Sequence, residues 1–458
     1  MQGTRRAITA GTTLTATAAV ALLLASAVAG ATTTTIDGAK APGPKRYDEV
    51  FVTKVGPKRA DRVLVLVPGT IGGAGDFSLV ARDVVERVPN LRVWLVDRRS
   101  QALEDTSLFE GALRGQASAD DAFDYYLRWI VDPSIQPHYE PLDDDEFGFV
   151  RDWGLEVSIR DLRHVVKAAG KGGREVILGG HSLGASTALA YAAWDFRGRP
   201  GYREIDGLVL IDGGLLGSFD GSTRREAEQD LAELEQGSPF TDLLGLGLPW
   251  TAGVFVEAGA LYAKQDPTAP SAIQQFPLLP AEFNPGATVT NRALLGYALD
   301  ADTSPAELAL IHVRAGRLAS SGDPRDWEDG EVTPVGRLAD TLAQEPANGV
   351  EWYYPRRLNI DVDGADKLRR NRVTKFLDLR TWHARKVDVP LYAFQTSLTG
   401  GDVLRGARRF VKRSAVRSRD ATLVDRSATT SHLDPLTAAP ETNDFLDTVA
   451  PFLKGAVR

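Results

Sequence analysis

Five apolar runs rich in β-branched residues recur along the chain and alternate with stretches that have helical spacing. Such runs are typical of strands buried on both faces, and their alternation with helices is typical of a parallel sheet. The runs are RVLVLV (62–67), LRVWLV (91–96), EVILGG (175–180), GLVLID (207–212) and VPLYAFQT (389–396), with a weaker one, ATLVD, at 421–425. The sequence therefore predicts an α/β fold in which helices flank a mostly parallel central sheet.

The predicted helices fall between these strands, but two long intervals interrupt the alternation. The helices are expected at 77–88, 157–170, 185–194 and 441–455. The first interval, 98–152, is rich in acidic and aromatic residues, and the second, 215–386, separates the fourth and fifth strands. Because so long a gap inside a compact sheet domain favours an insertion, we expect a cap subdomain at 215–386 between two parts of one core, 46–214 and 387–458.

Charge and cysteine content restrict the partners and the chemistry. The formal net charge is −8 and no long basic run is present, which argues against a nucleic-acid partner. The chain contains no cysteine, so disulfides, thiolate catalysis and cysteine metal sites are excluded.

The N-terminus has the succession of features that is typical of a secretory signal peptide. Arg5 and Arg6 precede a stretch without charges, and Ala27-Val28-Ala29 fits the small-residue cleavage pattern. We therefore expect a signal peptide at 1–29, export from the cell, and a flexible lead-in at 30–45. The alternative is an uncleaved anchor that holds the protein on the outer side of a membrane.

A G-x-S-x-G motif, Gly180-His181-Ser182-Leu183-Gly184, directly follows the third strand and directly precedes a predicted helix. In this context the chain has to turn sharply, and the turn lifts the serine hydroxyl above the sheet at a helix N-terminus. Side chains at the two flanking glycines would clash with the neighbouring strand and helix. Ser182 is therefore the candidate nucleophile, although a capping serine in a tight turn is the simpler alternative.

A serine hydroxyl needs a base, and the position of His432 favours it over the other five histidines. In this topology the base is expected on the loop beyond the last strand, where His432 is the only histidine. His181 neighbours the serine, so its side chain is expected to point elsewhere. His164 is predicted on a helix, and His312 and His383 lie in the insertion, where surface or packing roles are expected.

Two aspartates compete for the role of orienting the imidazole. Asp402 follows the fifth strand in a loop that can reach His432, and it is the preferred candidate; Asp212, at the end of the fourth strand, is the alternative. Asp434 is too close in sequence to His432. For an oxyanion hole we expect the N–H groups of Leu183 and Thr70, with Ile71 as the second choice for the latter.

Taken together, these residues resemble the α/β-hydrolase family of serine esterases, lipases and their relatives. The resemblance covers 46–214 and 387–458 and includes Pro68-Gly69-Thr70, the serine motif and the chain order Ser182, Asp402, His432. It implies a cap inserted after the strand that ends at Asp212. The chain departs from the family pattern at Pro68, where histidine is commoner, and in a longer glycine-rich loop before Asp402. At 96–107 many members carry a short arginine-glycine turn; here, one interpretation is that Arg98 or Arg99 braces the loops.

The predicted function is hydrolysis of a carboxylic ester, a small molecule or a lipid-like substrate, through an acyl-enzyme and without a metal or organic cofactor. A peptidase using the same residues and a non-catalytic binding protein with this fold are the alternatives. A dinucleotide-binding oxidoreductase is disfavoured, because the glycines after the first strand, at 69, 72, 73 and 75, do not form G-x-G-x-x-G.

Overall fold

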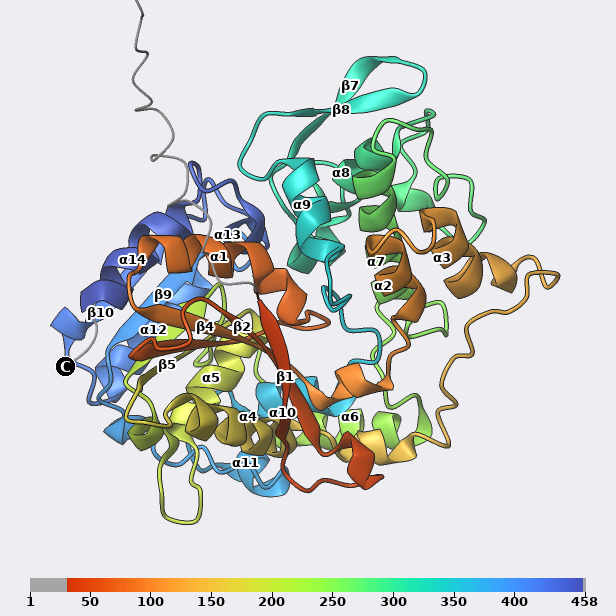
Figure 1. The fold of residues 1–458 in the computed structure, drawn as a ribbon. Helices are drawn as coiled ribbons and strands as arrows, with labels where there is room; N and C mark the ends of the chain where they lie inside the picture. The colour runs from red at the N-terminus through yellow and green to blue at the C-terminus, as the bar shows by residue number, and fades with distance from the viewer. Residues whose placement is uncertain (1–30, 456–458) are drawn as a thin grey trace, which may run out of the picture.

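An eight-stranded sheet forms the centre of the molecule (Figure 1) in the computed structural model, which describes residues 31–455. The predicted signal peptide at 1–29 lies outside the described residues. The strand order is β1-β2-β4-β3-β5-β6-β9-β10, and β4, β3, β5, β6, β9 and β10 are parallel. The strands are β1 Thr32–Asp37, β2 Glu49–Val55, β3 Arg62–Val67, β4 Leu91–Asp97, β5 Glu175–His181, β6 Gly207–Ile211, β9 Leu391–Gln395 and β10 Ala421–Asp425. The predicted mostly parallel sheet is confirmed.

Helices cover both faces of the sheet (Figure 1). Helices α1, α13 and α14 pack on one face, and α4, α5, α10 and α12 lie on the other. The helices are α1 Ser78–Arg87, α2 Ser107–Leu113, α3 Ala119–Tyr126, α4 Leu155–Ala169, α5 Leu183–Ala193, α6 Arg224–Gln236, α7 Thr251–Gln265, α8 Asn291–Leu299, α9 Val335–Leu342, α10 Arg356–Ala365, α11 Arg372–Phe376, α12 Asp402–Arg413, α13 Asp434–Thr437 and α14 Asp444–Gly455. Within the described part of the chain, no helix is both long and apolar enough to span a membrane.

The side chains of each central strand alternate between the two cores. In β3, Val63 and Val65 face the core under α4 and α5, whereas Leu64 and Leu66 face the core under α1 and α14. Successive residues of a strand point to opposite faces, so a strand covered on both sides has to be apolar at every position. This requirement explains why the central strands appear in the sequence as continuous apolar runs.

The expectation of a flexible lead-in at 30–45 is wrong for the described residues. Thr32–Asp37 forms the edge strand β1 and pairs antiparallel with β2, and the Ala39 N–H donates to Asp161 at 2.7 Å. The side chain of Arg99 then joins Asp161 to the Ala39 carbonyl. The threonine-rich composition suggested a linker, but threonine is β-branched and suits a half-exposed strand once an edge is available for pairing.

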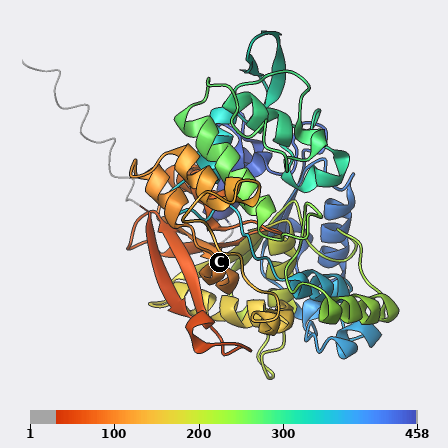
Figure 2. The ribbon, with the colours of Figure 1, turned by 90° about the vertical axis from the view of Figure 1, so that its right-hand side faces the viewer.

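The segment between β6 and β9 divides into two groups of elements (Figures 1 and 2). Helices α7, α8 and α9 pack together with the hairpin of β7 (Gly316–Gly322) and β8 (Arg325–Asp329), and α3 packs against α7. Helices α6, α10 and α11 instead pack with one another, and α10 contacts α4 and α5. The limits 215 and 386 and the role of a cap stay predictions.

One carboxyl group lies in the apolar contact between α7 and the chain after α9. The side chain of Glu257 is 2% exposed and accepts a hydrogen bond from the Trp352 indole N–H at 3.1 Å. Burial, together with the nearby charge of Asp76, raises the pKa of Glu257 from 4.5 to about 8, although hydrogen bonds from Trp352 and Val350 act in the opposite direction. In the folded protein Glu257 is therefore mostly protonated at pH 7.

We predict that Glu257→Gln makes the stability of the protein less dependent on pH. A group whose pKa rises on folding stabilises the fold below its unfolded pKa, and this contribution is lost as the pH rises towards the folded value. Relative to the wild type, the variant should gain free energy of unfolding from about pH 5 to about pH 8 and no more above that. Urea denaturation across this range measures the difference. The same substitution at the exposed Glu235 is the control and should leave the pH profile unchanged.

Candidate active site

Ser182 occupies a sharp turn between β5 and α5, as its motif predicts. Its backbone has φ 55° and ψ −124°, a region that residues other than glycine rarely adopt. The turn is held by a hydrogen bond from the Ser182 N–H to the Ile211 carbonyl of the adjacent strand, at 2.9 Å. The serine therefore stands at the carboxyl end of the parallel sheet, directly before the N-terminus of a buried helix.

The glycines of the motif are required by close backbone contacts. A Cβ atom at Gly180 would lie 2.3 Å from the carbonyl carbon of Gly184, and one at Gly184 would lie 2.0 Å from the carbonyl oxygen of Val67. Neither contact is possible without moving the backbone. The expected steric reason for both glycines is thus confirmed.

His432 lies on the loop after β10, where it was expected, and its side chain is buried. Its Nδ1 atom lies 2.5 Å from Oδ2 of Asp212, which follows directly on β6. The two side chains are 1% and 0% exposed, respectively. His432 and Ser182 line the same cavity, so the structure brings these two predicted residues together across 250 positions of the chain.

The preference for Asp402 as the partner of His432 is wrong, and the structure places the alternative, Asp212, there. Asp402 begins helix α12, and its half-exposed carboxylate pairs with Arg405 one turn further along. The residue at the end of β9 that does approach the site is Thr396, whose N–H donates to Asp212 Oδ1 at 2.8 Å and whose hydroxyl donates to Oδ2. Helix α12 instead keeps Asp402 at its own N-terminus, where an acidic side chain is favourable.

The surroundings of Asp212 keep it ionised. Burial alone raises the pKa of a carboxyl group, but the hydrogen bonds from His432 and Thr396 outweigh this effect, so that the net pKa of Asp212 is lowered. An ionised carboxylate against Nδ1 fixes that nitrogen as a donor and leaves Nε2 free to accept a proton. The pair can therefore serve as an oriented base.

His181 contacts His432, although its side chain was expected to point away from the site. The ring centroids lie 4.2 Å apart, and His181 Nε2 lies 2.9 Å from the His432 carbonyl oxygen. Burial and the neighbouring His432 lower the pKa of His181 to about 3, so it is neutral at physiological pH. A neutral ring can donate to the His432 carbonyl without adding a positive charge beside the base.

The loop after β3 is held by Arg98, one of the two arginines proposed to brace the loops. Its guanidinium donates to the carbonyls of Pro68 at 2.5 Å, Gly69 at 2.8 Å and Gly72 at 3.2 Å. It also pairs with Glu351 at 2.6 Å. Arg99 lies elsewhere and pairs with Asp161.

These contacts orient the peptide groups of the loop. In a trans peptide the C=O and N–H point in opposite directions, so the N–H of Thr70 points away from Arg98 when the Gly69 carbonyl accepts from it. Thr70 lines the cavity that contains Ser182, and a Cβ atom at Gly69 would lie 2.9 Å from Ser182 Cβ. Leu183 is the first residue of α5, so its N–H has no acceptor within the helix. Both predicted donors are thus available beside the serine.

Several residues that hold the site together carry no sequence motif, because they come from the long insertion. Glu351 binds Arg98, and its N–H donates to the Ile71 carbonyl at 2.6 Å. The hydroxyl of Tyr354 shares a hydrogen bond with the Thr70 side chain. The carbonyl of His312 accepts from the Leu433 N–H at 3.0 Å, directly after the base. No motif marked these positions, since each contact forms only when the insertion folds over the sheet.

Asp434 acts through the shape of the loop and not through the imidazole. Its carboxylate accepts from the Ser431 N–H at 2.7 Å, the Arg314 N–H at 3.0 Å and the Thr333 hydroxyl at 2.7 Å. Burial raises its pKa to about 6 against these hydrogen bonds. The loop that carries His432 is therefore tied to two points of the insertion.

Comparisons with known proteins find only distant similarities, all to solved structures. No family model matches the chain, and no curated protein matches it. Among solved structures, it is similar to an α/β-hydrolase fold protein from Nakamurella multipartita (14% identity, 92% of this chain and 99% of the other, TM-score 0.39). It is also similar to a monoacylglycerol lipase from Paleococcus ferrophilus (13% identity, 89% of this chain and 99% of the other, TM-score 0.38). A third similar structure is an epoxide hydrolase from Vigna radiata (11% identity, 93% of this chain and 98% of the other, TM-score 0.41). The parallel strand order and the serine turn after β5 are by themselves those that the α/β-hydrolase fold predicted from the sequence requires.

Proposed function

We propose that the protein is a serine hydrolase that cleaves carboxylic esters through an acyl-enzyme. The observation that carries this proposal is the buried pair of His432 and Asp212, whose histidine lines the same cavity as a serine held at positive φ. A strained backbone and a buried ionised carboxylate both cost stability, so their presence together at one site favours a catalytic role.

The proposed reaction has two steps that use the same groups. His432 Nε2 takes the hydroxyl proton of Ser182 while the serine oxygen attacks the ester carbonyl. The N–H groups of Leu183 and Thr70 stabilise the oxyanion that forms. The carbon–oxygen bond to the alcohol then breaks, and His432 returns the proton to the leaving oxygen. Water, deprotonated by His432, attacks the acyl-enzyme in the same manner and releases the acid and free Ser182.

Two further side chains support the charge that develops on His432. Asp212 stabilises the imidazolium because it is already ionised. His181 is neutral, so it adds no repulsion when His432 becomes positive. This distribution of charge favours a general base at neutral pH.

Covalent labelling tests the nucleophile. A fluorophosphonate probe should label the wild-type protein at Ser182, as located by peptide mass spectrometry, and should not label Ser182→Ala or heat-unfolded protein. Hydrolysis of p-nitrophenyl butyrate by Ser182→Ala or His432→Ala should fall by roughly 10⁴-fold or more. Labelling at another residue, or full activity of Ser182→Ala, would exclude the proposal. Hydrolysis of matched p-nitroanilides, with no measurable turnover of the esters, would identify a peptidase instead.

The two aspartates give opposite predictions. Asp212→Asn should lower kcat by about 10³-fold or more, because the amide cannot stabilise the imidazolium and disturbs its tautomer. Asp402→Asn should leave kcat within about twofold, since Asp402 pairs with Arg405 at the start of α12. Steady-state kinetics of both variants, with circular dichroism to verify folding, measures the contrast. Equal losses in the two variants would contradict the assignment of Asp212.

Arg98 is predicted to be a positioning residue for the oxyanion loop. Arg98→Lys keeps the charge but loses the fork that binds several carbonyls at once, so the loop should shift and kcat should fall roughly 10- to 100-fold with little change in KM. Arg99→Lys is the matched control, because Arg99 binds Asp161 and not this loop. It should lower the melting temperature without a selective loss of kcat. A merely structural role for Arg98 would make the two variants behave alike.

A further inference from the structure

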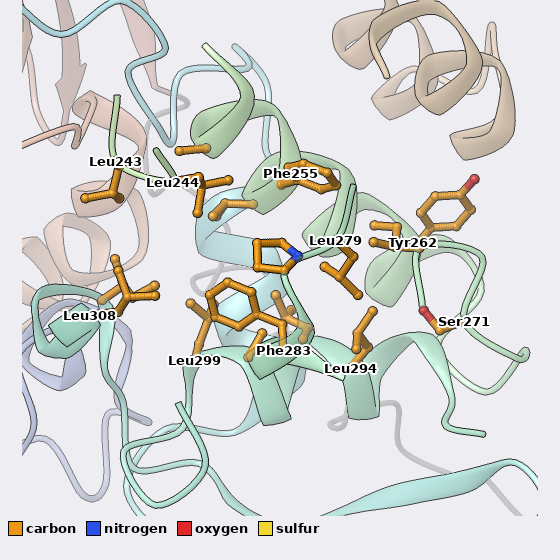
Figure 3. Close-up of a pocket in the computed structure, with 18 of the residues that line it drawn as sticks. Leu243, Leu244, Phe255, Tyr262, Ser271, Leu279, Phe283, Leu294, Leu299 and Leu308 are labelled. Atoms are coloured by element: carbon orange, nitrogen blue, oxygen red, sulfur yellow. The ribbon is translucent and has the colours of Figure 1, made fainter. Parts of the chain in front are cut away.

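A second, larger cavity lies between α7, α8 and the loop segments around them (Figure 3). It contains about 810 Å³ of space that protein atoms do not fill, part of which is open to solvent. Figure 3 shows Leu243, Leu244 and Leu308 on one side, and Tyr262 and Ser271 towards the other. Apart from Ile71, the lining residues therefore come from several elements of the segment between β6 and β9, including α7 and α8.

The walls of this cavity are almost entirely apolar. Of the residues that line it, only Tyr262, Ser271 and Asn291 have polar side chains. Two of these direct their polar groups to the protein: the Tyr262 hydroxyl donates to Asp120 at 2.6 Å, and the Asn291 amide donates to the Asp266 carbonyl at 2.9 Å. The third, the Ser271 hydroxyl, is buried and has no hydrogen-bond partner in the described structure. A ligand in this space is therefore recognised chiefly through buried hydrocarbon, with Ser271 as the one polar group left for it.

The apolar cavity adjoins the cavity that contains Ser182 and His432. Four residues line both: Ile71, Val256, Leu299 and Ile311. Ile71 directly follows Thr70 of the oxyanion loop, whereas none of the residues 431–433 around His432 lines the apolar cavity. Because the alcohol would leave beside His432, an acyl group would extend past Ile71, where the two cavities adjoin.

We propose that this cavity is an acyl pocket and that the substrates are esters of long, unbranched fatty acids. The inference rests on the proposed function and adds the substrate class. Each methylene that moves from water into the cavity gains free energy, so longer acyl chains are preferred until the cavity is full.

Gly259 of α7 keeps the pocket open. A Cβ atom there would lie 3.8 Å from Leu295 Cδ1 and 3.9 Å from Ile273 Cδ1, ordinary contacts that leave the backbone undisturbed. Glycine is otherwise a poor choice inside a helix. A larger side chain at this position would therefore fill the cavity while α7 keeps its fold.

Kinetics on two ester series test the pocket. For p-nitrophenyl esters from acetate to decanoate, below their critical micelle concentrations, kcat/KM of the wild type should rise by up to roughly fourfold per methylene. Gly259→Leu should lose at least tenfold on the decanoate and less than twofold on the acetate, and Gly259→Ala should show a smaller loss. Gly336→Leu, on an open helical surface of α9, is the matched control and should change kcat/KM on neither the decanoate nor the acetate. In the second series, alkyl acetates of increasing alcohol length should show no comparable rise.

Binding to the inactive Ser182→Ala variant separates the pocket from the reaction. The fluorescence of cis-parinaric acid should increase on binding, and adding Gly259→Leu should weaken this binding at least tenfold. The proposed acyl pocket would be overturned if kcat/KM did not change with acyl length and if parinarate binding were unchanged in the Gly259→Leu variant. A rise only in the alkyl acetate series would assign the cavity to the alcohol instead. Failure of the proposed function is distinct, because every ester would then be inert and the fluorophosphonate would not label Ser182.

Discussion

The hydrogen bond between His432 Nδ1 and Asp212 Oδ2 joins the loop beyond the last strand to the interior of the sheet, and the geometry of the site depends on it. Asp212 follows directly on β6, which lies between the serine strand β5 and β9. His432 comes from the loop beyond β10, at the far edge of this parallel set. A buried imidazole and a buried carboxylate are each costly alone, so each requires the other. The contact therefore fixes the loop of the base over the strand next to the nucleophile.

The insertion between β6 and β9 acts on both halves of the site. Through Glu351 and Tyr354 it contacts Arg98 and Thr70 and so fixes the oxyanion loop. Through Arg314 and Thr333 it binds Asp434 and so fixes the loop that carries His432. A change in the position of the insertion would therefore move both the donors and the base.

Two carboxyl groups with raised pKa values lie where the insertion meets the core. Asp97, which accepts from Ala74 and Asn348, has a pKa of about 7, raised chiefly by burial. Glu257 has one of about 8 for the same principal reason. These groups lie where α7 and the chain near Asn348 meet the oxyanion loop. Their protonation favours close packing of the insertion on the core, since neutral carboxyl groups cost less to bury than ionised ones.

The sequence by itself determined the central strands, the serine turn and the histidine. Continuous apolar runs are required where a strand is covered on both faces, glycines are required at Gly180 and Gly184 where backbones touch, and only one histidine follows the last strand. These are local constraints, so they are visible in neighbouring residues. Only the tertiary structure decided between Asp212 and Asp402, paired β1 with β2, and brought Arg98 to Glu351. Those outcomes depend on strand order and on how a long insertion folds back, because such contacts join residues whose separation along the chain carries no periodic signal.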